Sequence, residues 1–269
     1  MRSLILLASL AVLLGAAPKA TPVKVYILAG QSNMDGRGKK SDLVGDLARW
    51  AKPQADVAIA YSNSNRRGPF ATDGFVPLEP GFSVPPGTKQ AKLPGATFGP
   101  EVSFGRAIAD ANSDVRTVLI KFSEGGTSLH GDWMPEAKNS LYPQFLAFVQ
   151  KSLKSLGGDA KIEAMVWHQG ESDASLKEGE YQKLLTAFIA QIRKDLASPD
   201  LPFVIGEVYD NAKRDRIRAG QRATAASVDN VYFAPADKLQ TSDGGTHFDA
   251  ASQIEMGQRL AAALMKKEK

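Results

Sequence analysis

The sequence predicts an α/β fold in which a parallel β-sheet is covered by helices on both faces. Short apolar, β-rich segments recur along the chain, and segments with helical spacing of apolar residues lie between them. Strands that alternate with helices in this way are typical of βαβ units. The chain has 269 residues, of which 43% are hydrophobic, so it is long enough for one complete α/β domain. We expect residues 21–269 to form that single domain.

The predicted elements follow one another in a regular order. The strands are expected at residues 23–28, 115–122, 162–167, 203–208 and, more weakly, 231–234. Helices are expected after Pro100, because proline suits a first helical turn, and over residues 181–192 and 254–264, where apolar residues recur at helical spacing. Residues 62–98 are rich in Gly, Pro, Asn and Ser, which predicts a long ordered loop packed near the functional site rather than a linker.

The N-terminus has the pattern of a secretory signal peptide, which we place at residues 1–20. Arg2 precedes an apolar run over residues 4–14, and small residues follow at 15–17. The run is short for a bilayer span, which needs about 20 residues. We therefore expect cleavage after Ala17 or Ala20, export to the periplasm or the medium, and no stable membrane span afterwards. An uncleaved anchor is the alternative.

Composition excludes several kinds of function. The chain has no cysteine, which excludes thiolate catalysis, disulfides and zinc sites with cysteine ligands. Its net charge of +4 is spread along the chain, and the one tight basic cluster, at residues 213–218, is predicted to be a solvated helix face rather than a nucleic-acid site. The chain has neither a P-loop nor a G-x-G-x-x-G motif after the first strand, so we expect no nucleotide cofactor.

Unusual polar residues are concentrated in four short segments. These are residues 30–34 (GQSNM), 125–128 (GGTS), 168–173 (HQGESD) and 243–249 (DGGTHFD). The first three follow predicted strands, and the fourth precedes the last predicted helix. Ligands of open parallel sheets bind beyond the carboxyl ends of the strands. We therefore expect the four segments to converge on one crevice.

Ser32 is the candidate nucleophile. It lies in the turn after the first strand, where a following helix would offer backbone N–H groups to an anion. The alternative is an ordinary N-cap serine. Met34 stands where a G-x-S-x-G motif needs its second glycine, so the nucleophile elbow of an α/β-hydrolase is not supported.

His247 is the candidate general base among only three histidines. It follows a flexible Asp-Gly-Gly-Thr segment, in which Asp243 is close enough to orient its ring. The alternative is a surface histidine. His168 ends an apolar strand and is expected to be buried and hydrogen-bonded, whereas His130 is expected in a loop or at the rim of the site.

Two further segments offer groups that could hold an oxyanion. The pair Gly125-Gly126 would let backbone N–H groups approach a ligand closely, although a simple tight turn also explains it. The side-chain amide of Gln169 could donate to an oxyanion. A metal site made from His168, Glu171 and Asp173 would match no usual ligand spacing, so no metal is expected.

Together these segments resemble a known family. The motifs G-Q-S-N-M at 30–34, F-G-P-E at 98–101, G-G-T-S at 125–128, W-H-Q-G-E-S-D at 167–173 and the terminal D…H-F-D are similar to those of the sialate O-acetylesterase, or carbohydrate esterase family 6, branch of the SGNH hydrolases. The resemblance spans roughly residues 23–264. It implies a flavodoxin-like, three-layer α/β/α fold and metal-independent removal of acetyl groups from sugars, through an acyl-enzyme and without a cofactor.

The resemblance also implies roles for particular residues. Ser32 matches the nucleophile and His247 the base, while the N–H groups of Ser32 and Gly126 and the side chain of Gln169 match the oxyanion hole. Many SGNH enzymes have their acid three residues before the histidine, but Asp243 is four before it. Asp243 is thus the expected acid, and Glu171 is the other candidate.

Two other functions stay open at this point. One is a non-catalytic carbohydrate-binding protein on the same fold, and the other is an SGNH lipase or thioesterase, which the lack of a continuous apolar lid in residues 62–98 disfavours. Trp133 and Phe248 could stack on sugar rings or belong to the core. The sequence identifies neither the sugar, whether acetylxylan or sialate, nor the oligomeric state.

Overall fold

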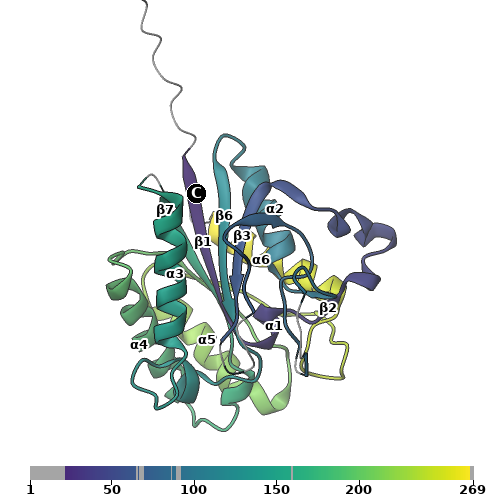
Figure 1. Cartoon of the computed structure of the whole chain (residues 1–269). Coiled ribbons are helices and arrows are strands. Elements are labelled where there is room, and N and C mark those ends of the chain that lie inside the picture. The colour runs from purple at the N-terminus through teal and green to yellow at the C-terminus, as the bar shows by residue number, and fades with distance from the viewer. Residues whose placement is uncertain are drawn as a thin grey trace, which may run out of the picture.

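A seven-stranded β-sheet forms the centre of the molecule in the computed structural model, which describes residues 22–64, 66, 70–85, 87–88, 92–158 and 160–266 (Figure 1). The strand order is β4-β3-β6-β1-β7-β8-β9. The edge pair β3–β4 is antiparallel, and the other neighbouring pairs are parallel. The strands are β1 (Val23–Gly30), β3 (Gln54–Ser62), β4 (Val76–Leu78), β6 (Arg116–Ser123), β7 (Ala160–His168), β8 (Phe203–Gly206) and β9 (Val231–Ala234).

The order of the parallel strands creates a switch point at β1. The strands β6-β1-β7-β8-β9 have the order 2-1-3-4-5 when they are numbered along the chain, which is the flavodoxin-like arrangement. The strand that follows β1 in this set, β6, lies on one side of it, and β7 lies on the other. The connection from β1 toward β6 and the connection from β7 to β8 therefore run in opposite directions, and the ends of β1 and β7 mark the place where ligands of such sheets bind. The segment between β1 and β6 adds β3 and β4 at the sheet edge.

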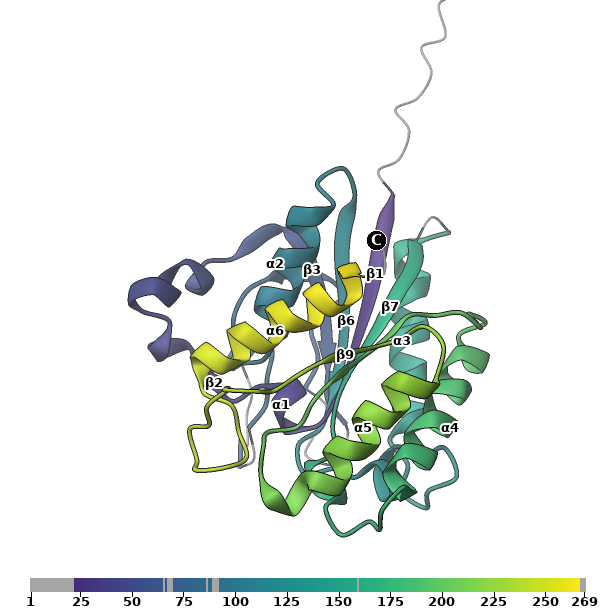
Figure 2. The same ribbon diagram turned by 180° about the vertical axis from the view of Figure 1, so that it is seen from behind.

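Helices cover both faces of the sheet, as the sequence predicts. In β1, Val25 and Ile27 pack toward α3, α4 and α5, whereas Tyr26 and Leu28 pack toward α2 and α6. This alternation follows from the two-residue period of a strand, and both sets are apolar because both faces are covered. Figure 2 shows α6 crossing its face of the sheet beside α2. The helices are α2 (Glu101–Ala111), α3 (Tyr142–Leu156), α4 (Glu180–Asp195), α5 (Asp215–Ser227) and α6 (Ala250–Met265).

Strand β3 and helix α3 are not among the elements that the sequence predicts. Strand β3 contains several alanines, such as Ala58 and Ala60, and alanine is depleted in strands, so its strand signal is weak. Helix α3 buries Tyr142, Phe145 and Val149, a spacing of three and four residues that is helical. Both elements contribute to the cores on either side of the sheet.

The segment predicted as a long loop, residues 62–98, includes β4 and β5 (Thr97–Phe98). Strand β5 pairs with β2 (Gly38–Lys39), and Ser83 and Val84 contact Asp35, three residues after Ser32. The described parts of this segment therefore pack beside the predicted site. A cavity of about 580 Å³ in the same region is lined by residues such as Phe70, Phe82 and Leu93.

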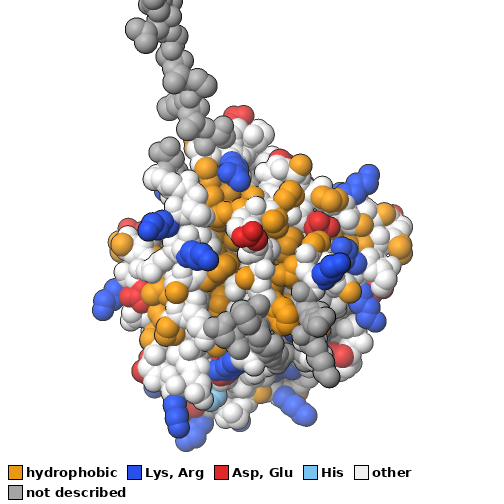
Figure 3. All heavy atoms as spheres, in the orientation of Figure 1, with side chains coloured by type: hydrophobic (Ala, Val, Ile, Leu, Met, Phe, Trp, Pro, Cys, Tyr) orange, Lys and Arg blue, Asp and Glu red, His pale blue; other side chains and the backbone are white. Residues whose placement is uncertain are grey.

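On the face seen in Figure 3, Lys and Arg side chains are scattered, and apolar side chains are exposed between them. Among the described residues, no helix has the length and apolar character needed to cross a membrane. The predicted signal peptide, residues 1–20, lies outside the described residues.

Candidate active site

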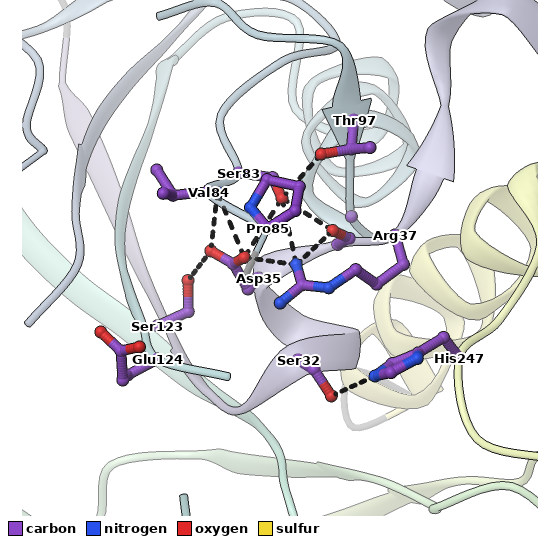
Figure 4. Close-up of polar contacts among 12 residues, drawn as sticks. Ser32, Asp35, Arg37, Ser83, Val84, Pro85, Thr97, Ser123, Glu124 and His247 are labelled. Atoms are coloured by element: carbon purple, nitrogen blue, oxygen red, sulfur yellow. Dashed lines mark hydrogen bonds and ion pairs between the residues drawn. The ribbon is translucent and has the colours of Figure 1, made fainter. Parts of the chain in front are cut away.

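The four polar segments meet at the carboxyl edge of the sheet, as predicted. Strand β1 ends at Gly30, β6 at Ser123 and β7 at His168, so three of the segments begin at neighbouring strand ends. The fourth segment, which precedes α6, brings His247 against Ser32 (Figure 4). Residues 215 positions apart in the chain are thus in direct contact.

Three side chains form a row at the carboxyl edge of the sheet, and we call it the Ser–His–Asp row (Ser32, His247 and Asp243). The Oγ of Ser32 lies 3.1 Å from Nε2 of His247, and Nδ1 of His247 lies 2.6 Å from Oδ2 of Asp243. An ionised carboxylate can only accept hydrogen bonds, so the ring donates its Nδ1 proton to Asp243. The lone pair of Nε2 is then directed at the Ser32 hydroxyl. This is the tautomer that a general base needs.

Asp243 is held as a carboxylate by its own loop. Its Oδ1 accepts hydrogen bonds from the backbone N–H of Thr246 (3.0 Å) and of His247 (2.9 Å). Partial burial acts to raise the pKa of Asp243, but these N–H groups and the adjacent His247 ring outweigh it, and the pKa is lowered. Glu171, the other candidate acid, contacts Asn33 instead of the His247 ring.

The turn that carries Ser32 requires a glycine before it. Gly30 has φ +150°, and a Cβ at this position would lie 2.1 Å from the backbone oxygen of His168. Ser32 is the first residue of the short helix α1 (Ser32–Asp35), whose N-cap is Gln31. The alternative of an N-cap serine is therefore wrong, and the Ser32 hydroxyl faces His247 instead.

The backbone N–H groups of Ser32 and Gly126 are available to an anion. Within the described part of the chain, the N–H groups of Ser32 and Gly126 have no hydrogen-bond acceptor. Gly126 is exposed and has φ +74°, a conformation that favours glycine. Gly125 lies against Ser32, since a Cβ built on this glycine would be 3.6 Å from the Ser32 Cβ.

The hydrogen bonds of Gln169 do not agree with the prediction that its side chain donates to an oxyanion. The residue is fully buried, and its amide nitrogen already has three acceptors: Gln31 Oε1 (3.0 Å), the Thr127 carbonyl (3.0 Å) and Asp173 Oδ2 (2.5 Å). An amide has only two N–H groups, so none is left for a substrate in this arrangement. Gln169 instead ties the residue before Ser32 to the turn that contains Gly126.

A buried cluster of polar and charged side chains surrounds Asp35, the last residue of α1, and holds this helix in place. The sequence analysis did not identify this cluster. Asp35 accepts hydrogen bonds from Ser123 (2.9 Å) and Arg37 (2.5 Å) (Figure 4), and also from Tyr61 (2.7 Å). Burial acts to raise the pKa of Asp35, but the charges of Arg37 and Lys121 outweigh it and lower this pKa. The signal was present in the sequence, because Asp35 and Arg37 directly follow the GQSNM motif.

Comparison with known proteins assigns the chain to a family. The model of the family described as carbohydrate esterase, sialic acid-specific acetylesterase matches residues 22–266. The chain belongs to this carbohydrate esterase family. A probable carbohydrate esterase of Arabidopsis thaliana is 28% identical over 255 residues, which cover 91% of each protein.

Solved structures support the same fold for this esterase. The X-ray structure of an Arabidopsis thaliana protein matches with a TM-score of 0.73 and 23% identity, over 91% of this chain and 98% of that one. NanS matches with a TM-score of 0.64 and 16% identity, over 93% and 100%. A carbohydrate acetylesterase from Xanthomonas citri matches with 0.62 and 19%, and this chain spans only 55% of its length.

The structure of this esterase also tests the predicted positions of two histidines and two aromatic residues. His130 is half-exposed and bonds through Nδ1 to Asp173 (2.7 Å), which agrees with a rim position. His168 is buried as predicted, but its ring nitrogens have no partner among the described residues, and burial lowers its pKa. Trp133 and Phe248 are both fully buried, so they belong to the core and cannot stack on a sugar.

The prediction of a solvated basic helix face is wrong for two of its members. Arg214 is buried and donates to the Gly245 carbonyl (2.9 Å) and to Thr246 Oγ1 (3.0 Å), so it supports the loop that carries His247. Arg218 is also buried and pairs with Glu207 (3.0 Å). These arginines face inward because the polar groups of neighbouring loops provide acceptors for them.

Proposed function

We propose that this esterase hydrolyses O-acetyl esters on carbohydrates through an acyl-enzyme formed on Ser32. The observation that carries the proposal is the Ser–His–Asp row, in which Ser32 Oγ, His247 and Asp243 are connected at 3.1 Å and 2.6 Å. The N–H groups of Ser32 and of Gly126, the residue after the Gly125 that lies against Ser32, have no acceptor among the described residues. The membership of the family provides the class of substrate.

Each part of the row has a step in the proposed reaction. His247 Nε2 takes the proton of Ser32 as its Oγ attacks the acetyl carbonyl, and Asp243 stabilises the imidazolium that forms. The N–H groups of Ser32 and Gly126 hold the negative oxygen of the tetrahedral intermediate. The C–O bond to the sugar then breaks, and the sugar oxygen takes the proton from His247. A water molecule repeats the sequence, releasing acetate and restoring Ser32.

The Ser–His–Asp row is exposed enough to accept an ester whose alcohol part is a bulky sugar. The side chains of His247 and Asp243 are 31% and 39% exposed, so the leaving sugar can extend into solvent. We propose acetylated xylan or an acetylated sialic acid as the substrate type. Export to the periplasm or medium, proposed from the pattern of residues 1–20, would bring the enzyme to such sugars.

Acetate release from three substrates tests the proposal: acetylated xylan, an O-acetylated sialic acid and an aryl acetate. We expect the wild-type protein to release acetate and Ser32→Ala to lower kcat by about 10⁴-fold or more. Ser155→Ala is the matched control, because Ser155 bonds only to the Ser152 carbonyl in α3 and should keep full activity. Full activity in Ser32→Ala would refute the mechanism.

Aryl esters of increasing acyl length separate the proposed function from its rivals. We expect acetate to be preferred over butyrate and octanoate. A preference for long acyl chains would indicate a lipase or thioesterase. Binding of the acetylated sugars without release of acetate would indicate a non-catalytic carbohydrate-binding protein.

A further inference from the structure

Asn33, the neighbour of Ser32, makes contacts on both sides of His247. Its side-chain Oδ1 accepts a hydrogen bond from the Phe248 N–H (3.0 Å), and its Nδ2 donates to the Thr246 carbonyl (2.9 Å). Thr246 and Phe248 are the residues directly before and after His247. One buried amide, adjacent in sequence to the proposed nucleophile, therefore holds the backbone on either side of the proposed base.

Glu171 determines which way round this amide lies. The second N–H of Asn33 donates to Glu171 Oε1 at 2.6 Å, and both side chains are buried. An ionised carboxylate only accepts, so the NH₂ end of the amide faces Glu171 and its oxygen faces the Phe248 N–H. The two N–H groups of Asn33 thus each have an acceptor, and its oxygen has an N–H donor.

The loop that carries His247 needs such a support. It contains Gly244 and Gly245, which have φ +75° and +142°, and it is partly exposed. Arg214 and Asn211 bond to the Gly245 carbonyl, before His247, but they make no contact after it. The N–H groups of Ser242 and Asp249 also hold this segment, through the His247 and Gln240 carbonyls (2.9 and 3.2 Å). Among the described residues, however, Asn33 alone hydrogen-bonds to the backbone of both Thr246 and Phe248. A general base must stay within hydrogen-bond reach of its proton, and a displacement of about 1 Å can lower the rate about 10²-fold.

We propose that Asn33 is a positioning residue that maintains the contact between Ser32 Oγ and His247 Nε2, with Glu171 as its anchor. The inference rests on the proposed role of the Ser–His–Asp row. It assigns a function to the carboxylate that does not contact the His247 ring. It also explains why the residue next to the nucleophile is an amide, since only a side-chain amide combines two N–H donors, here to Glu171 and Thr246, with an acceptor oxygen, here for the Phe248 N–H.

Variants of Asn33 test the proposal on an aryl acetate. Asn33→Ala is expected to lower kcat by about 10–10²-fold and to change KM less than threefold, because Asn33 is buried and its amide is bonded to Glu171, Thr246 and Phe248. Asn33→Asp has the same shape but no N–H, and it would place a second carboxylate against Glu171. We expect it to lose at least as much kcat. Gln54→Ala is the control, since Gln54 donates one buried hydrogen bond to the Val102 carbonyl in another part of the fold.

Variants of Glu171 provide an independent test in which Asn33 stays in place. Glu171→Gln keeps an acceptor oxygen for the Asn33 amide, and Glu171→Ala removes it. We expect Glu171→Ala to lose about 3–30-fold in kcat and Glu171→Gln to lose clearly less. These variants decide the question even if Asn33→Ala does not fold.

The imidazole NMR signals give a readout that a purely structural role would not change. The chain has three histidines, so the signals can be assigned by single substitutions. In folded Asn33→Asp and Glu171→Ala we expect the His247 signals to shift or broaden while those of His130 stay in place. Unchanged kcat and unchanged His247 signals in these folded variants would overturn the proposal. If Ser32→Ala or His247→Ala stayed active, the proposed function itself would fail instead.

Discussion

Substitution of Asp243 by Asn tests the choice of the acid most directly. The asparagine would keep an oxygen for the two backbone N–H groups that now bond to Oδ1, so the loop retains its fold. Its NH₂ group would then stand where Oδ2 now accepts from His247 Nδ1 at 2.6 Å. A donor in that position favours the tautomer with the proton on Nε2. His247 could then no longer accept the proton of Ser32.

The contacts of Asp243 indicate how far kcat should fall in Asp243→Asn. A hydrogen bond to a charged group contributes about 1.5–3 kcal/mol, which alone corresponds to roughly 10–10²-fold in rate. The wrong tautomer adds to this, and the equivalent change in a well-studied serine protease lowers kcat about 10⁴-fold. Asp243 is 39% exposed, so water can replace part of its effect. We therefore expect kcat to fall by about 10²–10⁴-fold.

The assay compares Asp243→Asn and Glu171→Gln side by side on an aryl acetate, with thermal unfolding as a check on folding. Glu171→Gln should lose much less, because Glu171 contacts Asn33 rather than the His247 ring. Near-full turnover in Asp243→Asn together with a collapse in Glu171→Gln would show that the reasoning is wrong and that Glu171 is the acid.

Three further predictions concern metals, stability and export. Activity should survive EDTA, and a loss that Zn²⁺ restores would contradict the serine mechanism. Arg37 and Lys121 hold the pKa of Asp35 below its ordinary 3.8 despite burial, so its ionised form stabilises the fold above that pH. Asp35→Asn should therefore lower the unfolding free energy by about 3 kcal/mol near neutral pH. In urea titrations, the difference in unfolding free energy between the wild-type protein and Asp35→Asn should become smaller only as the pH falls below 3.8. A constant difference down to pH 2 would be inconsistent with this. Secreted protein should begin after Ala17 or Ala20, and N-terminal sequencing that finds Met1 would exclude cleavage.

Much of the site can be predicted from local sequence. The five parallel strands from β1 to β9 that form the flavodoxin-like set were visible as short apolar runs, because burial on both faces leaves little room for polar residues. Parallel strands end at one edge, so polar residues just after them were expected to meet. Ser32 and His247 do meet there, and their contact agrees with the prediction.

Features that depend on the partners of buried polar groups could not be predicted in this way. Local spacing allowed Gln169 to face a substrate, yet Gln31 and Asp173 surround its amide. The same holds for Arg214, which looked like a residue of a solvated helix face but bonds to the loop of His247. Desolvation makes an unpaired polar group costly, and which partner meets that need depends on how distant loops pack.

The sequence by itself determined the fold class, the edge of the sheet at which the site lies, and the candidate nucleophile and base. The fold class and the edge follow from hydrophobic periodicity and from the direction of parallel strands, which are local properties of the chain. The choice of Ser32 and His247 follows from their residue types and from the resemblance to the esterase family. Only the tertiary structure decided that Asp243 rather than Glu171 contacts His247, and that Glu171 contacts Asn33. Both carboxylates lie in the right segments, but a side chain's direction is set by the contacts between loops that are far apart in sequence.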